Sequence, residues 1–310
     1  MTDLSLSPLN LMPRIHFGDW VNDVVNWMVR HWGNVLDHIA SGLDWLVEHI
    51  YDELMSAPIV AVVIVLAVIA FLVRGPVLGI LAAIGFLLID SFDEWSASME
   101  TLSLIIVAAA IAIVISVPLG ILAAKSKVAS VVMRPLLDLM QTLPAFVYLL
   151  PALFLFGLSY TTAILATLVF SMPPGIRLTE LGIRQVDAEM VEAGQSFGAT
   201  GRKILFGVQI PLARPTIMAG VNQVIMLSLS MVVIGGMVGA GGLGGDVTSA
   251  LQNLDIAPGA EAGISVVILA VYLDRVTAGF SKQDQRSGIA WARRLFERQR
   301  AATAIGTGAA

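Results

Sequence analysis

Long runs without a charged residue are the feature of this 310-residue chain that most restricts its fold. Twenty uncharged residues separate Glu53 from Arg74, and the stretches 101–124, 139–176 and 215–245 are also free of charge. About 20 apolar residues in a helix cross a hydrocarbon core of about 30 Å. Only 13% of the residues are charged, about half the share in an ordinary soluble domain. The runs lack the alternation of a membrane barrel, so the sequence predicts an all-α polytopic membrane protein.

Seven spans are expected from the uncharged runs. They are 54–73, 75–89, 101–124, two within 139–176 joined by a tight turn at 157–160, one in 215–245, and 262–280. The last contains Asp274 and Arg275, which we expect to pair with each other. Pro144 and Pro151 are expected to kink the fourth span without ending it.

Basic residues fall almost entirely on one side of the seven expected spans. With the N-terminus outside, sixteen of the eighteen Lys and Arg residues lie inside, and only Arg14 and Arg30 lie outside. Lys and Arg collect in cytoplasmic loops, so this split predicts an N-out, C-in topology. The first residues lack a basic region followed by an apolar core, and no cleavable signal peptide is expected.

Four segments are expected along the chain. They are an extracytoplasmic amphipathic segment (1–53), two N-terminal spans (54–92), a transmembrane domain (93–280) and an Arg-rich cytoplasmic tail (281–310). From 19 to 53, acidic residues gather on one helical arc and tryptophan and aliphatic residues on the other, with a break suggested at Gly33 or Gly42. The apolar arc lies on the outer membrane surface or packs against protein, and both alternatives stay open. The histidines of this region are expected to be solvated or to lie at the membrane interface, and to bind no metal: His16, His31, His38 and His49.

The longest polar connection on the expected inner side runs from 174 to 214. Apolar residues recur there at helical spacing among charged ones, which predicts an amphipathic helix suited to docking another protein. Gly194, Gly198 and Gly201 interrupt the apolar face and allow a sharp turn and a close backbone approach. The apolar positions are Met190, Ala193, Phe197, Ile204 and Val208.

This connection resembles the EAA signature of ABC importer permeases, whose pattern is E-A-A, three residues, G, nine residues and I-x-L-P. The matching residues are Glu192-Ala193-Gly194, Gly198 and Val208-Gln209-Ile210-Pro211. Gly194 replaces the second alanine of that pattern, and Val208 and Ile210 replace its Ile and Leu. Further segments resemble the glycine betaine/proline betaine permeases over 94–280: 141–151, 192–200, 215–223, 229–244 and 273–277.

The resemblance implies a MetI-like permease core in a bacterial cytoplasmic membrane, with no catalytic activity or cofactor of its own. It also implies two copies of a cytoplasmic ABC ATPase subunit, an extracytoplasmic substrate-binding protein and a second copy of this chain as partners, and no nucleic acid. Membrane lipid surrounds the spans. The solute stays open among glycine betaine, proline betaine, choline, carnitine and trimethylamine oxide. The implied ATPase-coupling residues are Glu192, Ala193, Gly194, Phe197, Gly198 and Pro211.

Polar residues inside the expected spans are costly there and are candidates for a translocation pathway. The alternative is that they form hydrogen bonds between helices or within a dimer. Tyr148 and Tyr160 offer ring faces to a quaternary ammonium group. The pathway candidates are Gln141, Thr142, Ser171, Asn222, Gln223 and Ser230.

Other functions have weaker support. Gly239-x-Gly241-x-x-Gly244 matches a dinucleotide fingerprint, but it follows a membrane span and not a strand, so we expect a turn at the outer face. No Gly-Lys pair occurs, so any ATP must be hydrolysed by another chain. The alternative of an ion-coupled secondary transporter would place charges in the middle of the spans, which the clear spans lack.

Overall fold

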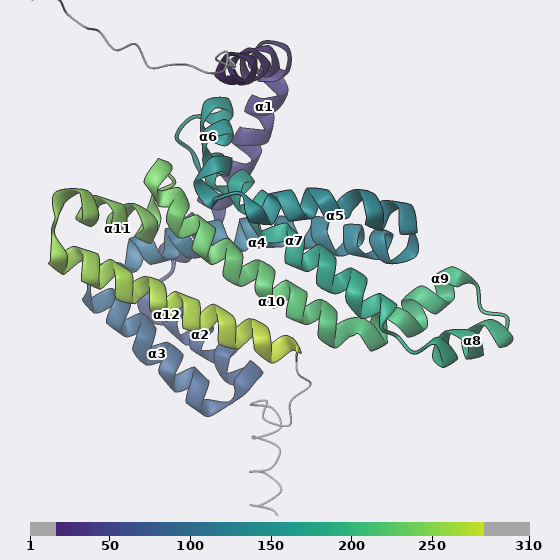
Figure 1. The fold of residues 1–310 in the computed structure, drawn as a ribbon. Helices are drawn as coiled ribbons and strands as arrows, with labels where there is room; N and C mark the ends of the chain where they lie inside the picture. Colours follow the sequence, from purple (N-terminus) through teal and green to yellow (C-terminus); the bar gives the residue numbers. More distant parts are fainter. Residues whose placement is uncertain (1–16, 282–310) are drawn as a thin grey trace, which may run out of the picture.

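The computed structural model describes residues 17–281, and every regular element in that range is helical (Figure 1). The predicted all-α membrane fold is thus confirmed, while residues 1–16 and nearly all of the expected tail lie outside the described range. A π-helical turn, η1 (Leu205–Gln209), leads into α10, and a 3-10 turn, η2 (Gly236–Val238), follows it. The α-helices are α1 (Phe17–Ser56), α2 (Ile59–Arg74), α3 (Pro76–Ser91), α4 (Trp95–Lys125), α5 (Lys127–Thr142), α6 (Ala145–Phe156), α7 (Tyr160–Arg184), α8 (Ala188–Ser196), α9 (Gly201–Ile204), α10 (Ile210–Gly235), α11 (Gly242–Asn253) and α12 (Ile256–Ser281).

The long apolar helices α4, α7, α10 and α12 form the centre of the molecule. Helix α7 packs against both α4 and α10, and α12 packs against α10 and α2. Small residues allow the backbones to approach closely: a Cβ on Gly120 of α4 would lie 2.5 Å from the Cβ of Thr179 in α7. Helices α8 and α9 project at one end of this bundle, and α11 lies at the other (Figure 1). We call these the α8 end and the α11 end.

The first expected span is shorter in the structure, whereas the second keeps almost its expected bounds as α3. Helix α1 continues to Ser56, the chain turns at Pro58, and α2 begins at Ile59 with a bend of 108° between the two helices. Proline ends α1 because it has no N–H to continue the helical hydrogen bonds. Helices α2 and α3, of 16 residues each, then pack together as a hairpin around Gly75, whose φ is 90°.

The fourth expected span is not a single helix. Helix α5 ends at Thr142 and α6 begins at Ala145, with a bend of 95° between them. The prediction that Pro144 only kinks this span is therefore wrong, whereas Pro151 does lie inside α6. The tight turn predicted at 157–160 is confirmed, because Gly157 follows α6 with φ 68° and α7 begins at Tyr160.

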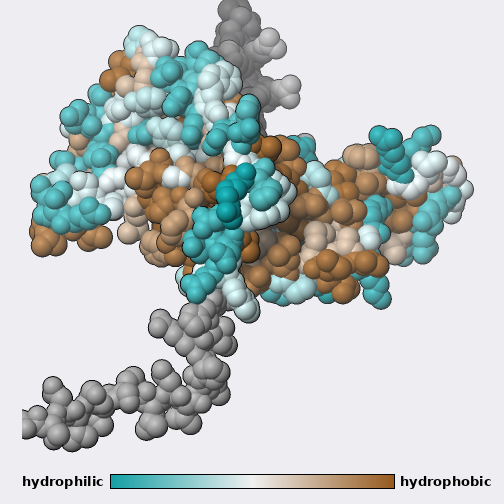
Figure 2. All heavy atoms as spheres, turned by 90° about the horizontal axis from the view of Figure 1, so that it is seen from above, coloured by the Kyte–Doolittle hydropathy of each residue, from teal (hydrophilic) through white to brown (hydrophobic). Residues whose placement is uncertain are grey.

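The number of spans differs from the seven expected. Within residues 17–281, four helices are long and apolar enough to cross a membrane, or up to six if α1 with α2 and α5 with α6 each count as one broken span. The expected second span corresponds to α3, a shorter apolar helix outside that count. Figure 2 shows broad apolar areas on one face of the molecule, with polar side chains at both ends and also over the centre of the view. The apolar areas suit a chain that contacts lipid.

The amphipathic N-terminal segment is one helix, α1, without a break at Gly33 or Gly42. Its second half packs against the bundle, where Leu36 and Val47 are buried. The carboxylate of Asp44 accepts hydrogen bonds from the N–H and the hydroxyl of Thr161, each 2.9 Å long. Most of the predicted apolar arc is not used in this contact and is exposed: Trp20, Val24, Trp27, Trp32, Val35, Ile39 and Leu46.

Candidate functional site

The polar connection between α7 and α10 is shorter than the predicted range of 174–214. Helix α7 continues through Pro173 and Pro174 to Arg184, and α10 already begins at Ile210. Both prolines are buried among neighbouring helices, which lets the helix tolerate the backbone groups that they leave free. The projecting part therefore spans residues 185–209, which include α8, α9 and η1.

Helix α8 is a short, solvent-facing helix with defined caps. Its first turn is capped by the Asp187 carboxylate, which accepts a hydrogen bond of 3.0 Å from the N–H of Glu189. Its last turn ends at Gly198, whose φ of 74° lies in the left-handed region that favours glycine. No residue of α8 is buried, and the side chain of Phe197 just beyond it is 92% exposed. The helix expected from the sequence in this connection is thus present, and its side chains are exposed in the chain.

The base of the connection is packed into the bundle. Ile183, Leu205 and Ala213 are buried together, so the end of α7 and the start of α10 are held side by side. Ile204 is also buried, and a Cβ on Gly194 would lie 3.3 Å from its Cγ1. Gly194 therefore allows α8 to lie close against α9. The exposed helix α8 is therefore connected to the bundle through buried side chains.

A buried carboxylate fixes the end of α7 to α5. Glu180 is only 9% exposed, and its Oε1 accepts a hydrogen bond of 2.7 Å from the hydroxyl of Ser130. The same oxygen lies 3.0 Å from Nε of Arg184 and 3.7 Å from a guanidinium nitrogen of Arg134. Two arginines thus offset the burial of this carboxylate. The spacing of Glu180 and Arg184 by four residues could have predicted one of these pairs from the sequence.

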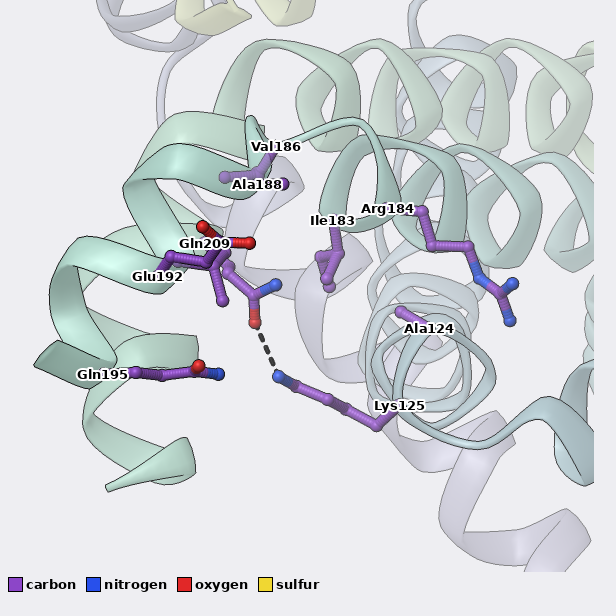
Figure 3. A pocket seen from close by; sticks show the side chains of 10 residues that line it. Ala124, Lys125, Ile183, Arg184, Val186, Ala188, Glu192, Gln195 and Gln209 are labelled. Carbon is purple, nitrogen blue, oxygen red and sulfur yellow. Dashed lines mark hydrogen bonds between the residues drawn. The ribbon is translucent and has the colours of Figure 1, made fainter. Parts of the chain in front are cut away.

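A hollow of about 370 Å³ separates α8 from the ends of α4 and α7 (Figure 3). Glu192 and Gln195 project into it from α8, and the ammonium group of Lys125 donates a hydrogen bond of 2.6 Å to Oε1 of Gln209 across it. This bond joins the end of α4 to η1 at the base of the connection. A displacement of α8 and η1 would therefore act directly on α4, α7 and α10.

The residues implied for coupling lie in two places. Glu192, Ala193, Phe197 and Gly198 are exposed on α8 and its terminal turn, and Gly194 is half-buried against α9. The exposed Pro211 lies apart, in the first turn of α10. The structure also contains positioning contacts that the sequence did not predict: Asp187 with Glu189, Lys125 with Gln209, and Ser130 with Glu180.

The six pathway candidates are in different surroundings. Ser171 is fully buried in α7, and its hydroxyl has no hydrogen-bond partner among residues 17–281. Asn222 of α10 donates a hydrogen bond of 3.4 Å to Asp274 and accepts one from Thr277, so it joins α10 to α12. The expected ion pair between Asp274 and Arg275 is present, at 3.7 Å. The other four candidates are exposed in the single chain: Gln141 and Thr142 at the end of α5, and Gln223 and Ser230 on α10.

The glycine-rich sequence at the α11 end forms a turn that is held by α4. The N–H of Gly242 donates a hydrogen bond of 2.7 Å to the Glu100 carboxylate, which also accepts one of 2.6 Å from the hydroxyl of Tyr160. The N–H of Leu243 donates to the hydroxyl of Thr101 at 2.9 Å. These N–H groups are occupied within the chain and are not free to bind a phosphate, in agreement with the prediction of a turn.

A second carboxyl group at the α11 end makes stability depend on pH. Glu94 precedes α4 and is 8% exposed; burial, and then the charge of Asp246, raise its pKa to about 7 from the ordinary 4.5. The stability that protonated Glu94 contributes is fully present below pH 4.5 and is lost as the pH rises through about 7. We expect Glu94→Gln to remove this loss, raising stability at pH 8.5 by on the order of 2 kcal/mol. The check is the thermal unfolding midpoint between pH 5 and 8.5.

The matched control for this prediction is Asp90→Asn, at an exposed position one turn earlier in the chain. It should leave the pH dependence of unfolding unchanged, because Asp90 does not contribute to the pKa shift of Glu94. If the unfolding midpoints of wild type and Glu94→Gln stay parallel over the whole pH range, Glu94 is not the group responsible.

Residues 116–283 match the model of a protein family described as "binding-protein-dependent transport system inner membrane component". Among curated proteins, the chain is 43% identical over 280 residues to the glycine betaine transport system permease protein OpuAB of Bacillus subtilis, covering 90% of this chain and 99% of the relative. It is 42% identical over 274 residues to the glycine betaine/proline betaine permease protein ProW of Escherichia coli, covering 88% and 77%. It is 41% identical over 276 residues to the glycine betaine/carnitine permease protein GbuB of Listeria monocytogenes, covering 88% and 98%.

Among solved structures, an inward-facing form of the MetNI methionine ABC transporter contains a chain of similar fold. Its TM-score is 0.51 with 21% sequence identity, over 60% of this chain and 95% of that chain. At this identity the similarity concerns the fold alone. The MetI-like core that the sequence resemblance implied is therefore confirmed as a fold.

Proposed function

This chain belongs to the family of binding-protein-dependent transport system inner membrane components, and from that premise we propose that α8 and its terminal turn receive the movement of a partner ATPase. The chain is the non-catalytic permease of an ABC importer for glycine betaine, proline betaine or a related quaternary ammonium compound. Its partners are an ATPase and a substrate-binding protein. The alternative of an ion-coupled secondary transporter is thereby set aside.

The observation that carries the coupling proposal is the contrast between the exposed α8 and its anchored base. Phe197 is 92% exposed beside a helix without buried residues, whereas Ile204 and Leu205 at the base are buried. A bulky aromatic side chain in such a position is typical of an interface anchor. Closure of the ATPase subunits would push on α8, and the packed base and the Lys125–Gln209 hydrogen bond would pass this movement to α4, α7 and α10.

A second copy of the chain is proposed to face α10, with one ATPase subunit docked on each copy. Helix α10 packs against α7, α4 and α12, yet one of its faces is left exposed along the helix. This face carries the polar residues Gln223 and Ser230, which are unfavourable opposite lipid tails. We therefore place the translocation pathway between the two copies, along this face. The residues exposed on it are Leu212, Pro215, Ala219, Gln223 and Ser230.

The α11 end is proposed to face the outside of the cell and the α8 end the cytoplasm. The distribution of lysine and arginine supports this orientation, because the α8 end contains Lys125, Arg184, Arg202 and Lys203. Helix α1 then lies on the outer side, where Asp44 bonds the start of α7 and the hydroxyl of Tyr51 lies 2.8 Å from that of Ser96.

Single cysteines test the orientation and the docking together, because the chain contains no native cysteine. We expect Asn253→Cys, exposed at the end of α11, to react with an impermeant thiol reagent added outside intact cells. Ser196→Cys, exposed on α8, should react only in inside-out vesicles, and addition of the ATPase subunit should slow its labelling at least about tenfold if docking covers the site. Ser249→Cys on α11 is the control, labelled in detergent solution where both ends of the protein are accessible, and the ATPase should not protect it.

Reversed labelling of Asn253→Cys and Ser196→Cys would refute the proposed orientation. Correct sidedness without protection of Ser196→Cys would show instead that the ATPase binds elsewhere.

A further inference from the structure

Helix α5 is joined to α7 mainly by polar side chains. Of its 16 residues, all in the described part of the chain, only Ser130 and Leu137 are buried. Its other large aliphatic side chains are exposed: Val128, Val131, Val132, Leu136 and Leu139. One hydrogen bond and two ion pairs link it to α7, through Ser130, Arg134 and Asp138. Contacts of this kind can exchange partners without opening an apolar core.

The contacts with α7 centre on the buried carboxylate of Glu180. Its Oε1 accepts a hydrogen bond of 2.7 Å from Ser130 and lies 3.0 Å from Nε of Arg184. The distance from the same oxygen to a guanidinium nitrogen of Arg134 is 3.7 Å, which is longer than a hydrogen bond. The side chain of Arg134 is also 64% exposed. Glu180 therefore holds the arginine of α7 closely and the arginine of α5 loosely.

Arg184 lies where a movement of the projecting connection enters the bundle. It is the last residue of α7, and the connection 185–209 begins at the next residue. Its guanidinium also donates a hydrogen bond of 2.8 Å to the carbonyl of Ala123, near the end of α4. A displacement of α8 and η1 would reach Arg184 before the rest of α7. The contact between Arg184 and Glu180 is therefore directly exposed to the movement of the connection.

A hollow of about 340 Å³ between α5 and α7 gives Arg134 room to move, and Glu180 and Arg184 line the same hollow. Asp138, also on its wall, is already paired with Arg177. A buried carboxylate that loses its arginine is strongly destabilised unless another cation replaces it. Arg134, held loosely beside the hollow, is placed to do so.

Building on the proposed function, we propose that Glu180 exchanges arginine partners during the transport cycle, holding Arg184 in the conformation described and Arg134 when the docked ATPase subunits close. The exchange draws α5 toward α7 as the connection moves. Glu180 is thus a positioning residue that passes the movement of α8 to α5, a helix that the Lys125–Gln209 hydrogen bond does not reach.

Arg134→Gln tests the exchange, in the permease reconstituted in vesicles with its ATPase and binding protein. The variant keeps the bonds of Glu180 to Ser130 and Arg184 and removes only the second partner. Glycine betaine uptake should fall at least about tenfold, while binding-protein-stimulated ATP hydrolysis stays within about threefold of wild type. The thermal unfolding midpoint should change little, because an exposed ion pair contributes little stability. Arg134→Lys retains a cation and should restore most of the uptake.

Arg184→Gln should have the opposite effect on ATP hydrolysis. With Arg134 as the remaining arginine partner of Glu180, the exchanged state is favoured. Hydrolysis without binding protein should therefore rise at least about threefold. Adding Arg134→Gln to this variant should abolish the rise, which separates the exchange from the loss of the Arg184 bond to Ala123.

Asp138→Asn is the matched control, because it breaks another ion pair between α5 and α7 without touching Glu180. Its uptake should stay normal, and uncoupling equal to that of Arg134→Gln would overturn the exchange. Normal uptake by Arg134→Gln would overturn it as well. So would a parallel loss of uptake and hydrolysis that Arg134→Lys does not restore, since that indicates a structural role alone. If the unmodified complex shows no binding-protein-stimulated hydrolysis, the proposed function itself fails, and the exchange with it.

Discussion

Gly198→Val is expected to abolish most solute uptake while leaving the permease folded in the membrane. Gly198 ends α8 with φ 74°, a conformation that costs a β-branched residue about 1–2 kcal/mol or more. The chain would relieve this strain by rearranging the turn, which displaces Phe197 and the exposed face of α8. A shift of 1–2 kcal/mol changes the docked population about 5- to 30-fold. The measurements are co-purification with the ATPase, binding-protein-stimulated ATP hydrolysis and uptake in vesicles.

The sharp turn expected at Gly198 is present, because its φ is 74°. A Cβ on Gly198 would meet no atom within 4 Å in this chain, so within the chain it is the backbone angle that requires glycine, and the close approach of another backbone stays a prediction. Gly198→Asn should therefore retain most activity, because asparagine tolerates the left-handed conformation. Gly201→Val, in the same connection but without positive φ, is the control and should dock normally. Normal uptake by Gly198→Val would show that this turn does not position a docking surface.

Gly236→Ala is expected to have the largest effect on folding. The added Cβ would lie 2.2 Å from the carbonyl carbon of Gly244 and 2.3 Å from the nitrogen of Gly245, and both are backbone atoms that cannot rotate away. Separating η2 from α11 should cost about 3 kcal/mol or more. We expect a much lower yield of monodisperse protein in detergent and a lower thermal unfolding midpoint.

The neighbouring Gly245→Ala is the matched control. It adds the same methyl group within α11, where a Cβ would meet nothing within 4 Å, and its stability should stay within about 0.5 kcal/mol of wild type. Equal stability of Gly236→Ala and Gly245→Ala would mean that η2 and α11 are not in close contact in the folded protein.

Several structural elements could be predicted from short stretches of the sequence. The uncharged runs predicted helices at membrane depth because no other structure satisfies the backbone there. Gly157 marked the turn before α7, and the spacing of Glu192, Gly198 and Pro211 marked the connection that carries α8. In each case the signal is a property of residues that are close in the chain.

Which prolines interrupt a helix could not be predicted from the local sequence. Pro118, Pro173 and Pro174 lie inside long helices, whereas Pro144 stands at a break of 95°. All four occur in uncharged runs, and the local sequence does not distinguish them. Neighbouring helices pack around Pro173 and Pro174, which lets α7 tolerate the freed backbone groups. Pro118 and Pro144 are both exposed, however, so burial of the proline does not by itself explain why α4 continues and α5 ends.

The sequence by itself determined that this chain is helical, lies in a membrane and has a helix in the polar connection before α10, since charge patterning and glycine spacing act through local physics. Only the tertiary structure decided that Asn222 bonds to α12 while Gln223 stays exposed, and that the Glu180 carboxylate lies near two arginines. It also placed Tyr148 of α6 against the buried cluster that contains Met231 of α10. These features join residues that are far apart in the chain. Their hydrogen bonds and ion pairs depend on how whole helices pack, which no local pattern encodes.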